Sequence, residues 1–200
     1  MEVVIIKYNA GNIRSVLFAL ERIGVNAIVT DNPDEIRSAD RVIFPGVGEA
    51  SSAMKYLKEK GLDKLICSLT QPVLGICLGM QLMCAHSEEN DTECLGIFDQ
   101  KVKLFPTKEG FKIPQIGWNN ITDLKSGLFA SVNEKAYMYF VHSYFVENCQ
   151  NAIAKTDYVI EYSAAIQKNN FSAVQFHPER SGDLGLQIYE NFFKFAGVKK

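Results

Sequence analysis

The first half of the chain alternates short apolar runs with segments of helical periodicity. The runs are rich in β-branched residues and lie at positions 3–6, 26–30, 41–44 and 72–76. Helical stripes follow them at 13–23, 31–39, 49–60 and about 78–85. Continuous apolar strands that alternate with helices predict a parallel sheet whose two faces are both covered.

The second half of the chain changes character. Strand-like segments separated by turns occur at 101–105, 136–147, 151–156, 161–167 and 171–176, and helical periodicity returns at 184–195. We therefore expect an α/β fold of three layers: an open, mostly parallel sheet with helices on both faces and an antiparallel β extension. No repeat or linker interrupts the 200 residues, so residues 1–200 are interpreted as one domain.

Composition excludes several classes of function. Hydrophobic residues make up 47% of the chain, and the net charge of −2 predicts no basic surface and no nucleic-acid partner. No apolar stretch approaches the ~20 residues that span a bilayer, and the apolar N-terminal run lacks the basic flank of a signal peptide. The five cysteines show no C-x-x-C spacing, which favours reduced thiols in the cytoplasm and no metal site.

One cysteine stands between two glycines, in the pattern Gly75-x-Cys77-x-Gly79, where the strand at 72–76 meets a helix. This is the arrangement of a nucleophile elbow, in which small neighbours let the helix pass close to the strand. The positive end of the helix favours a thiolate, and the N–H of Leu78 could donate to an oxyanion. The alternative is a buried cysteine beside two loop glycines.

A cysteine nucleophile needs a base, and the base needs a residue that orients it. Of the three histidines, His177 follows an apolar strand directly, and Glu179 stands two residues later, on the same side of an extended segment. We expect Glu179 to orient the ring of His177, and His177 to act as the base for Cys77. The alternative for His177 is a surface histidine at a strand end. His86 is expected in a polar loop, and His142 within an aromatic strand as a packing or hydrogen-bonding residue.

A second oxyanion donor is expected from the segment Pro45-Gly46-Val47-Gly48, which follows another strand. Small residues in this loop allow backbone N–H groups to face a reacting carbonyl, and loss of one such donor costs about 10²–10³ in rate. The alternative is an ordinary strand-to-helix loop, because no Lys or Ser/Thr follows to make it a phosphate-binding loop.

These three segments, in this order, resemble the class I, triad-type glutamine amidotransferases. The resemblance implies the flavodoxin-like α/β fold of that family, L-glutamine as the substrate and no cofactor. It also implies Cys77 as the nucleophile, His177 as the acid and base, Glu179 as its orienting residue, and an oxyanion hole made by Gly46, Val47, Gly48 and Leu78. Gln81, Ser143 and Tyr144 would bind the glutamine.

Longer stretches, among them "AGNIRSV", "IPQIGWNN" and "YFVHSYF", are similar to one branch of this family. That resemblance implies a glutaminase subunit that supplies ammonia to a separate cyclase subunit, a (β/α)₈ barrel. Trp118 is the only tryptophan, lies in a segment that reads as a loop, and is a candidate interface anchor, with core filling as its alternative. The weaker interface candidates are Asn119, Tyr137 and Arg180.

The first loop, "KYNAGN", departs from the Asp-Tyr-Gly start common in this branch at Lys7, Asn9 and Ala10. Three alternatives to the whole interpretation stand beside it. One is a paralogous glutaminase that feeds another synthase. The others are a cysteine hydrolase or peptidase on a similar sheet, and an inactive scaffold that only binds the barrel.

Overall fold

The computed structural model describes residues 1–9 and 12–194. Ala10 in the first loop and Phe195, the expected last residue of the final helix, lie outside the described residues. The elements of the first half are β1 (Val3–Ile6), α1 (Ile13–Arg22), β2 (Ala27–Thr30), α2 (Pro33–Ser38), β3 (Arg41–Gly46), α3 (Ala50–Glu59), α4 (Leu62–Ser68), β4 (Val73–Cys77) and α5 (Leu78–Leu82). Those of the second half are β5 (His86–Ser87), β6 (Thr92–Glu93), β7 (Lys101–Leu104), β8 (Gln115–Ile121), the 3₁₀ turn η1 (Gly127–Phe129), β9 (Ala136–His142), β10 (Tyr144–Val146), β11 (Ala152–Asp157), β12 (Glu161–Lys168), β13 (Phe171–Val174), the 3₁₀ turn η2 (Pro178–Arg180) and α6 (Gly182–Lys194).

The central sheet confirms the expected α/β fold. Its strand order is β11-β12-β13-β4-β3-β1-β2, and the five strands from β13 to β2 run parallel. The antiparallel extension is formed by β11 and β12. The order places β13 directly beside β4, with Val174 opposite Ile76, and β3 on the other side, with Gly46 opposite Cys77. The chain therefore leaves β3, β4 and β13 at one edge of the sheet, where open α/β sheets bind ligands.

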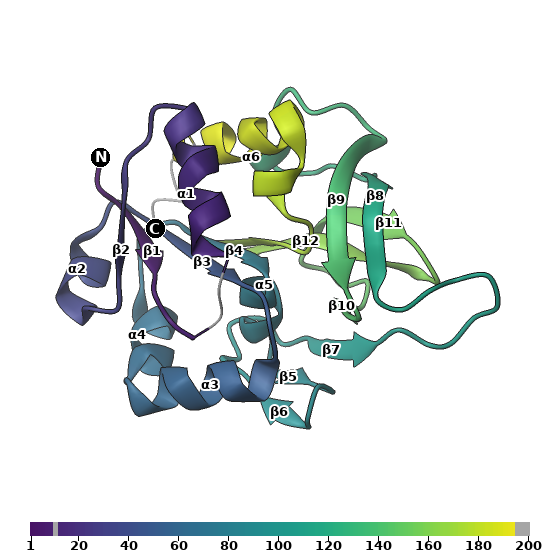
Figure 1. Cartoon of the computed structure of the whole chain (residues 1–200), viewed down its shortest axis with the longest axis horizontal. Helices are drawn as coiled ribbons and strands as arrows, with labels where there is room; N and C mark the ends of the chain where they lie inside the picture. Colours follow the sequence, from purple (N-terminus) through teal and green to yellow (C-terminus); the bar gives the residue numbers. More distant parts are fainter. Residues whose placement is uncertain (10–11, 195–200) are drawn as a thin grey trace.

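The strands are apolar on both faces because helices cover both. In β1, Val3 and Ile5 belong to one core cluster, and Val4 and Ile6 belong to the other. The first cluster packs under α1 and α6, and the second packs under α2, α3, α4 and α5, so the molecule has three layers (Figure 1). This alternation is the reason that β1 reads as a continuous apolar run.

Several predicted boundaries were wrong. The segment around Trp118, read as a loop because of Gly117 and its Asn neighbours, is the strand β8, which pairs antiparallel with β9 over seven residues. Pairing to a neighbouring strand overrides the weak β propensity of such residues. The expected strand at 136–147 is divided at Ser143 into β9 and β10, and the helix expected at 78–85 ends at Leu82.

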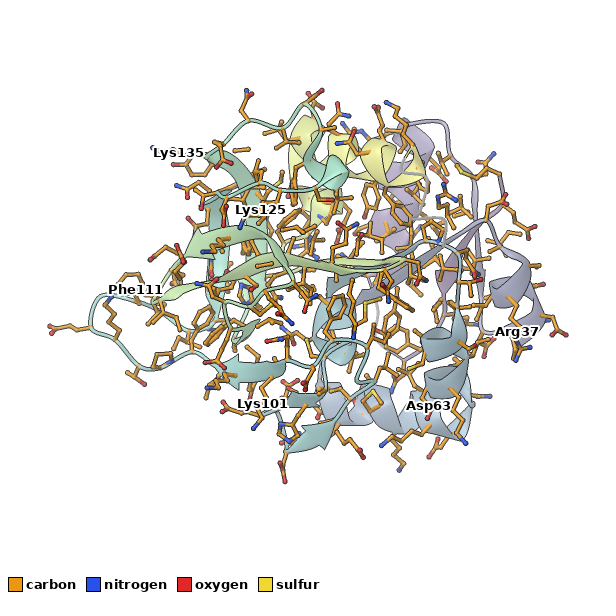
Figure 2. All side chains as sticks on the ribbon, turned by 180° about the vertical axis from the view of Figure 1, so that it is seen from behind. Arg37, Asp63, Lys101, Phe111, Lys125 and Lys135 are labelled. Carbon is orange, nitrogen blue, oxygen red and sulfur yellow. The ribbon has the colours of Figure 1, made fainter. Side chains whose placement is uncertain are left out.

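The β8–β9 ribbon lies at one end of the molecule, beside β11 and next to α6 (Figure 1). The connection from β7 to β8 forms a loop that extends away from the body, with Phe111 on it, as Figure 2 shows from behind. The ribbon packs its inner face on the first core cluster through Ile121, Met138 and Phe140. Its outer face is left open in the described chain.

Candidate active site

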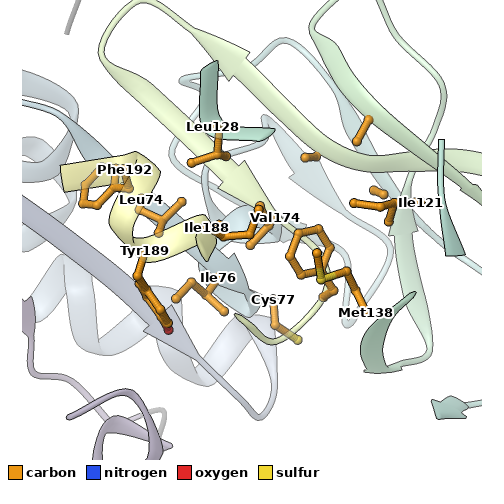
Figure 3. Close-up of a cluster of buried hydrophobic side chains, with 14 of the residues drawn as sticks. Leu74, Ile76, Cys77, Ile121, Leu128, Met138, Val174, Ile188, Tyr189 and Phe192 are labelled. Carbon is orange, nitrogen blue, oxygen red and sulfur yellow. The ribbon is translucent and has the colours of Figure 1, made fainter. Parts of the chain in front are cut away.

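Cys77 ends β4 and is the N-cap residue of α5, with φ +53° and ψ −108°, a positive-φ conformation that residues other than glycine rarely adopt. The two glycines that flank it are required by close packing. A Cβ atom on Gly79 would lie 1.9 Å from the carbonyl oxygen of Phe44, and one on Gly75 would lie 3.0 Å from the sulfur of Met83. Figure 3 shows Cys77 at the edge of the first core cluster, beside Ile76 and Met138. The geometry is that of a nucleophile elbow.

His177 follows β13 and lies at the same sheet edge as Cys77. Its Nδ1 atom is 2.7 Å from Oε1 of Glu179, and the two side chains are 2% and 1% exposed. The same oxygen accepts a hydrogen bond from Nδ2 of Asn12 at 2.6 Å. Glu179 is therefore held from two sides and fixes the ring of His177. The sequence interpretation missed Asn12, because 167 residues separate it from Glu179 and no local pattern joins them.

Because Glu179 occupies Nδ1 of His177, the other ring nitrogen, Nε2, is the one left for Cys77. Burial by itself lowers the pKa of His177, but the charge of Cys77, a hydrogen bond to its sulfur and the Glu179 carboxylate raise it to about 10. By strict distance and angle, Nε2 has no hydrogen-bond partner among the described residues. Cys77 thus raises the pKa of His177 without a regular hydrogen bond in the substrate-free chain, and catalytic hydrogen bonds often tighten only when a substrate binds. The surroundings of His177 therefore favour its protonated, imidazolium form.

A cavity of about 710 Å³ opens over these groups. Besides His177 and Arg180, seven of the residues expected to act on the substrate line it: Val47, Gly48, Cys77, Leu78, Gln81, Ser143 and Tyr144. Gly46 lies beside the cavity instead, where a Cβ atom would meet the hydroxyl of Tyr8 at 2.0 Å. Gly48 has φ +120°, which only glycine adopts without strain.

The cavity also exposes Glu89, which the sequence interpretation did not single out. Its carboxylate accepts a hydrogen bond from the N–H of Ala50 at 2.7 Å. Burial raises the pKa of the Glu89 carboxyl. The hydrogen bond from Ala50 lowers this pKa, and the negative charge of Glu49 raises it further. Glu89 is the acidic residue in the lining of this cavity, and its sequence context, "HSEEND", is typical of a solvated loop.

Gln81 is buried rather than facing solvent. Its Nε2 donates to the carbonyl of Tyr144 at 2.9 Å and to Oε1 of Gln175 at 3.1 Å. His142 holds the same Tyr144 carbonyl through Nδ1 at 2.8 Å. Burial lowers the pKa of His142 to about 3, so it is a neutral, hydrogen-bonding residue. His86, by contrast, lies half-buried in β5, where its Nε2 is 2.8 Å from Asp91.

The outer face of the β8–β9 ribbon is apolar and exposed. Ile116, Trp118 and Tyr137 are 64%, 55% and 55% exposed. Trp118 stands opposite Tyr139, with ring centroids 5.9 Å apart, and the Arg180 guanidinium lies 5.8 Å from the Tyr139 ring. Arg180 also lines the cavity, so this face borders the cavity's mouth.

Asn119 does not share this face. It alternates with Trp118 along β8, and its Nδ2 donates to the carbonyl of Asp157 on β11 at 2.7 Å. Asn119 was expected at an interface, but its side chain is already hydrogen-bonded within the chain.

In residues 1–9 and 12–194, no group of three or more His, Cys, Asp or Glu side chains is arranged to hold a metal ion. None of the helices described in that range has the length and apolar character needed to cross a membrane. All five cysteines are free thiols.

Comparisons with known proteins identify a family and several relatives that this chain resembles. A model of the family "Glutamine amidotransferase class-I" matches residues 4–195. A protein of Bacteroides fragilis, named "Imidazole glycerol phosphate synthase subunit HisH", is 55% identical over 97% of this chain and 100% of its own length. One of the same name from Bacteroides thetaiotaomicron is 54% identical over 96% and 98%. A crystal structure of a glutamine amidotransferase superimposes with a TM-score of 0.74 at 15% identity, covering 96% of this chain and 97% of that one.

Proposed function

The chain belongs to the class I glutamine amidotransferases, and on this premise we propose that it is the glutaminase subunit of an imidazole glycerol phosphate synthase, in histidine biosynthesis. The observation that carries the proposal is the buried His177–Glu179 pair, 2.7 Å apart, which follows β13, the strand next to the elbow that presents Cys77. The two relatives that carry this synthase's name, at 55% and 54% identity over nearly their full length, support the choice of synthase. The domain is proposed to comprise residues 1–200.

The first step is the attack of the Cys77 sulfur on the side-chain carbonyl carbon of L-glutamine. A C–S bond forms, and the carbonyl electron pair moves to the oxygen. Val47, Gly48 and Leu78 line the cavity, and we assign the stabilisation of the oxyanion to their backbone N–H groups. Gly46 gives the loop room against the hydroxyl of Tyr8. His177 then donates its Nε2 proton to the amide nitrogen, the C–N bond breaks, and ammonia leaves.

Acylation changes the acidity of His177 in the direction that the reaction needs. The charge of Cys77 and its hydrogen bond are two of the causes that hold the pKa of His177 at about 10 against burial. A thioester carries no such charge, so only Glu179 then raises the pKa of His177 against the effect of burial. The pKa falls, and the imidazolium becomes a stronger acid. Once the proton has left, neutral His177 can take a proton from water, which attacks the thioester, releases glutamate and restores the sulfur.

Recognition of glutamine is proposed to depend on three groups. The protein contacts of the Gln81 side chain found in the described chain are made by Nε2, which leaves Oε1 to accept from the substrate. The Glu89 carboxylate in the cavity suits the α-ammonium group of an amino acid. Backbone groups of Ser143 and Tyr144, at the junction of β9 and β10, would bind the α-carboxylate or the amide.

Ammonia released here needs an acceptor. We propose that the outer face of the β8–β9 ribbon docks onto a cyclase subunit, a (β/α)₈ barrel, in a one-to-one complex in the cytoplasm. The barrel would use the ammonia to make imidazole glycerol phosphate and aminoimidazole carboxamide ribonucleotide. Trp118, Tyr137 and Arg180 would contact it, because aromatic and arginine side chains dominate interface energies. The position of Arg180, between this face and the cavity, supports a short path for ammonia.

The test measures glutamine hydrolysis and product formation by the purified chain, alone and with the cyclase barrel and its nucleotide ligand. We expect glutamate to be released in step with product. Cys77→Ala should abolish glutamine-dependent synthesis and leave ammonia-dependent synthesis intact. If Cys77→Ala keeps glutamine-dependent synthesis, the assignment of the nucleophile is wrong. If hydrolysis is unaffected by this barrel but rises with another synthase, the chain is a paralogous glutaminase.

Docking has its own test. Trp118→Ala should weaken binding of the barrel by tenfold or more in calorimetry, as expected for an interfacial tryptophan. Phe18→Ala is the matched control, because Phe18 is an aromatic of similar exposure, 54%, on α1. Equal affinities for the two variants would exclude the β8–β9 face as the docking surface.

A further inference from the structure

Gln175 is a buried amide whose contacts both belong to the active site. It follows β13 and is 0% exposed. Its Nε2 donates to the sulfur of Cys77 at 3.7 Å, and its Oε1 accepts from Gln81 at 3.1 Å. One side chain therefore bridges the residue that attacks the substrate and a residue proposed to bind it.

The backbone explains why Gln175 reaches the sulfur. Gln175 and Phe176 form a bend directly after β13; the side chains of Gln175 and His177 approach Cys77, whereas Phe176 joins the first core cluster. The N–H of Gln175 is fixed to the carbonyl of Ala164 on β12 at 2.8 Å. A single rigid segment thus brings two nitrogen atoms to Cys77, one from the imidazole and one from the amide.

The sulfur is also in contact with a third group, the carbonyl oxygen of Val141, which accepts from the thiol at 3.9 Å. A carbonyl can bind only the protonated form, whereas an amide N–H can bind the charged form. The contacts of Gln175 and Val141 therefore favour different states and different directions of the sulfur. Gln175 draws it toward β13 and His177, and Val141 draws it toward β9.

A role in packing alone does not account for these contacts. Burying an amide in an apolar site is costly unless both its donor and its acceptor are used, and a methionine or leucine would fill the same volume. Here the donor and the acceptor are both used, by Cys77 and by Gln81. The side chain is thus suited to fixing the distance between sulfur and substrate site.

We propose that Gln175 is a positioning residue for glutamine hydrolysis, which holds the Cys77 sulfur in its attacking position and couples that position to Gln81. The inference rests on the proposed function, because it assumes that Cys77 attacks a bound glutamine. It adds a residue that touches neither the substrate nor the reacting amide, and acts only through Cys77 and Gln81.

The experiment compares Gln175→Met, which keeps the shape and removes both polar contacts, with Gln175→Glu, which keeps an acceptor for Gln81 but places an acceptor against the sulfur. Alkylation of Cys77 by iodoacetamide at pH 7 is followed by mass spectrometry of the Cys77 peptide in the isolated chain. Glutamine turnover is measured in the complex with the barrel. Both variants should lose about 10- to 100-fold in kcat and in alkylation rate, as expected for a lost hydrogen bond to a charged group.

The KM for glutamine separates the two contacts. It should rise in Gln175→Met, which releases Gln81, and change less in Gln175→Glu. The structural control is Asn191→Leu, which removes another buried amide, bonded to the carbonyls of Leu128 and Ala130 on α6's side of the sheet. It should destabilise the chain to a similar degree and leave both rates within about twofold of wild type.

The proposal is overturned if Gln175→Met binds the barrel, unfolds at the temperature of Asn191→Leu, and keeps wild-type kcat and alkylation. If Gln175→Met does not fold, the Gln175→Asn variant provides the test. Its side chain is one methylene shorter and cannot reach both Cys77 and Gln81, so it should show the same loss of rate. A wild-type chain that fails to hydrolyse glutamine with the barrel would instead refute the proposed function.

Discussion

Gly79→Ala tests whether the packing of the elbow, rather than the cysteine alone, makes the site. The added Cβ would lie 1.9 Å from the carbonyl oxygen of Phe44, and ordinary contact begins near 3.4 Å. The start of α5 would have to move away from β3 by about 1.5 Å, because the obstacle is backbone. Overpacking of this kind costs about 1–3 kcal/mol or more in the free energy of unfolding.

The displacement also moves the sulfur of Cys77 and the N–H of Leu78. Since a 1 Å misplacement at a reacting centre can cost about 10²-fold in rate, kcat should fall by at least that factor. Gly75→Ala is the matched comparison: its Cβ would meet Met83 atoms at 3.0 and 3.1 Å and the Cβ of Ala173 at 3.2 Å. Because the thioether of Met83 can turn aside, we expect a smaller loss of stability.

The assays are urea unfolding and glutamine hydrolysis in the presence of the barrel, with both variants measured beside wild type. A Gly79→Ala chain with the stability and kcat of wild type would refute the reasoning. So would a Gly75→Ala chain that is the more damaged of the two, because backbone and side-chain obstacles would then have been ranked wrongly.

Three further predictions concern the surroundings of the elbow. Asn12→Ala removes the 2.6 Å hydrogen bond to Glu179 and should lower kcat about tenfold with little change in KM, in steady-state glutaminase assays; a change in KM alone would contradict it. Glu89→Gln should raise the KM for glutamine about tenfold or more and leave kcat within a few-fold, since it removes the charge opposite the α-ammonium; an unchanged KM would exclude that contact. Burial lowers the pKa of His142 from 6.5 to about 3, so below pH 6.5 the unfolded chain binds a proton that the folded chain does not. The contribution of His142 to the free energy of unfolding should therefore be fully present above pH 6.5 and fall by about 1.4 kcal/mol per pH unit toward pH 3. In urea unfolding, His142→Gln should lack this decrease.

The sequence was sufficient for the parts of the molecule that local patterns determine. The apolar runs and helical stripes predicted the parallel sheet, and the glycines around Cys77 indicated its elbow. The boundaries of β8 could not be predicted, because its Gly and Asn residues favour turns and only the pairing with β9 holds them extended. Asn12 and Glu89 were not predicted either: Asn12 stands in the stretch "AGNIRSV" but 167 residues from Glu179, and Glu89 stands in a segment typical of a solvated loop.

Gln175 illustrates a different limit. It stands in the same short segment as His177, and the alternation of side chains along that segment could have placed both on one side of the strand. What the sequence could not supply is the partner on the opposite strand, because the contact joins residues 98 positions apart.

The positive-φ backbone of Cys77 also matters for how such chains change over generations. A side chain in that positive-φ conformation costs about 1–3 kcal/mol, which glycine would avoid. At position 77, selection for catalysis therefore opposes selection for durability. A copy of the chain that no longer needs the proposed nucleophile would release that strain by exchanging the cysteine for glycine.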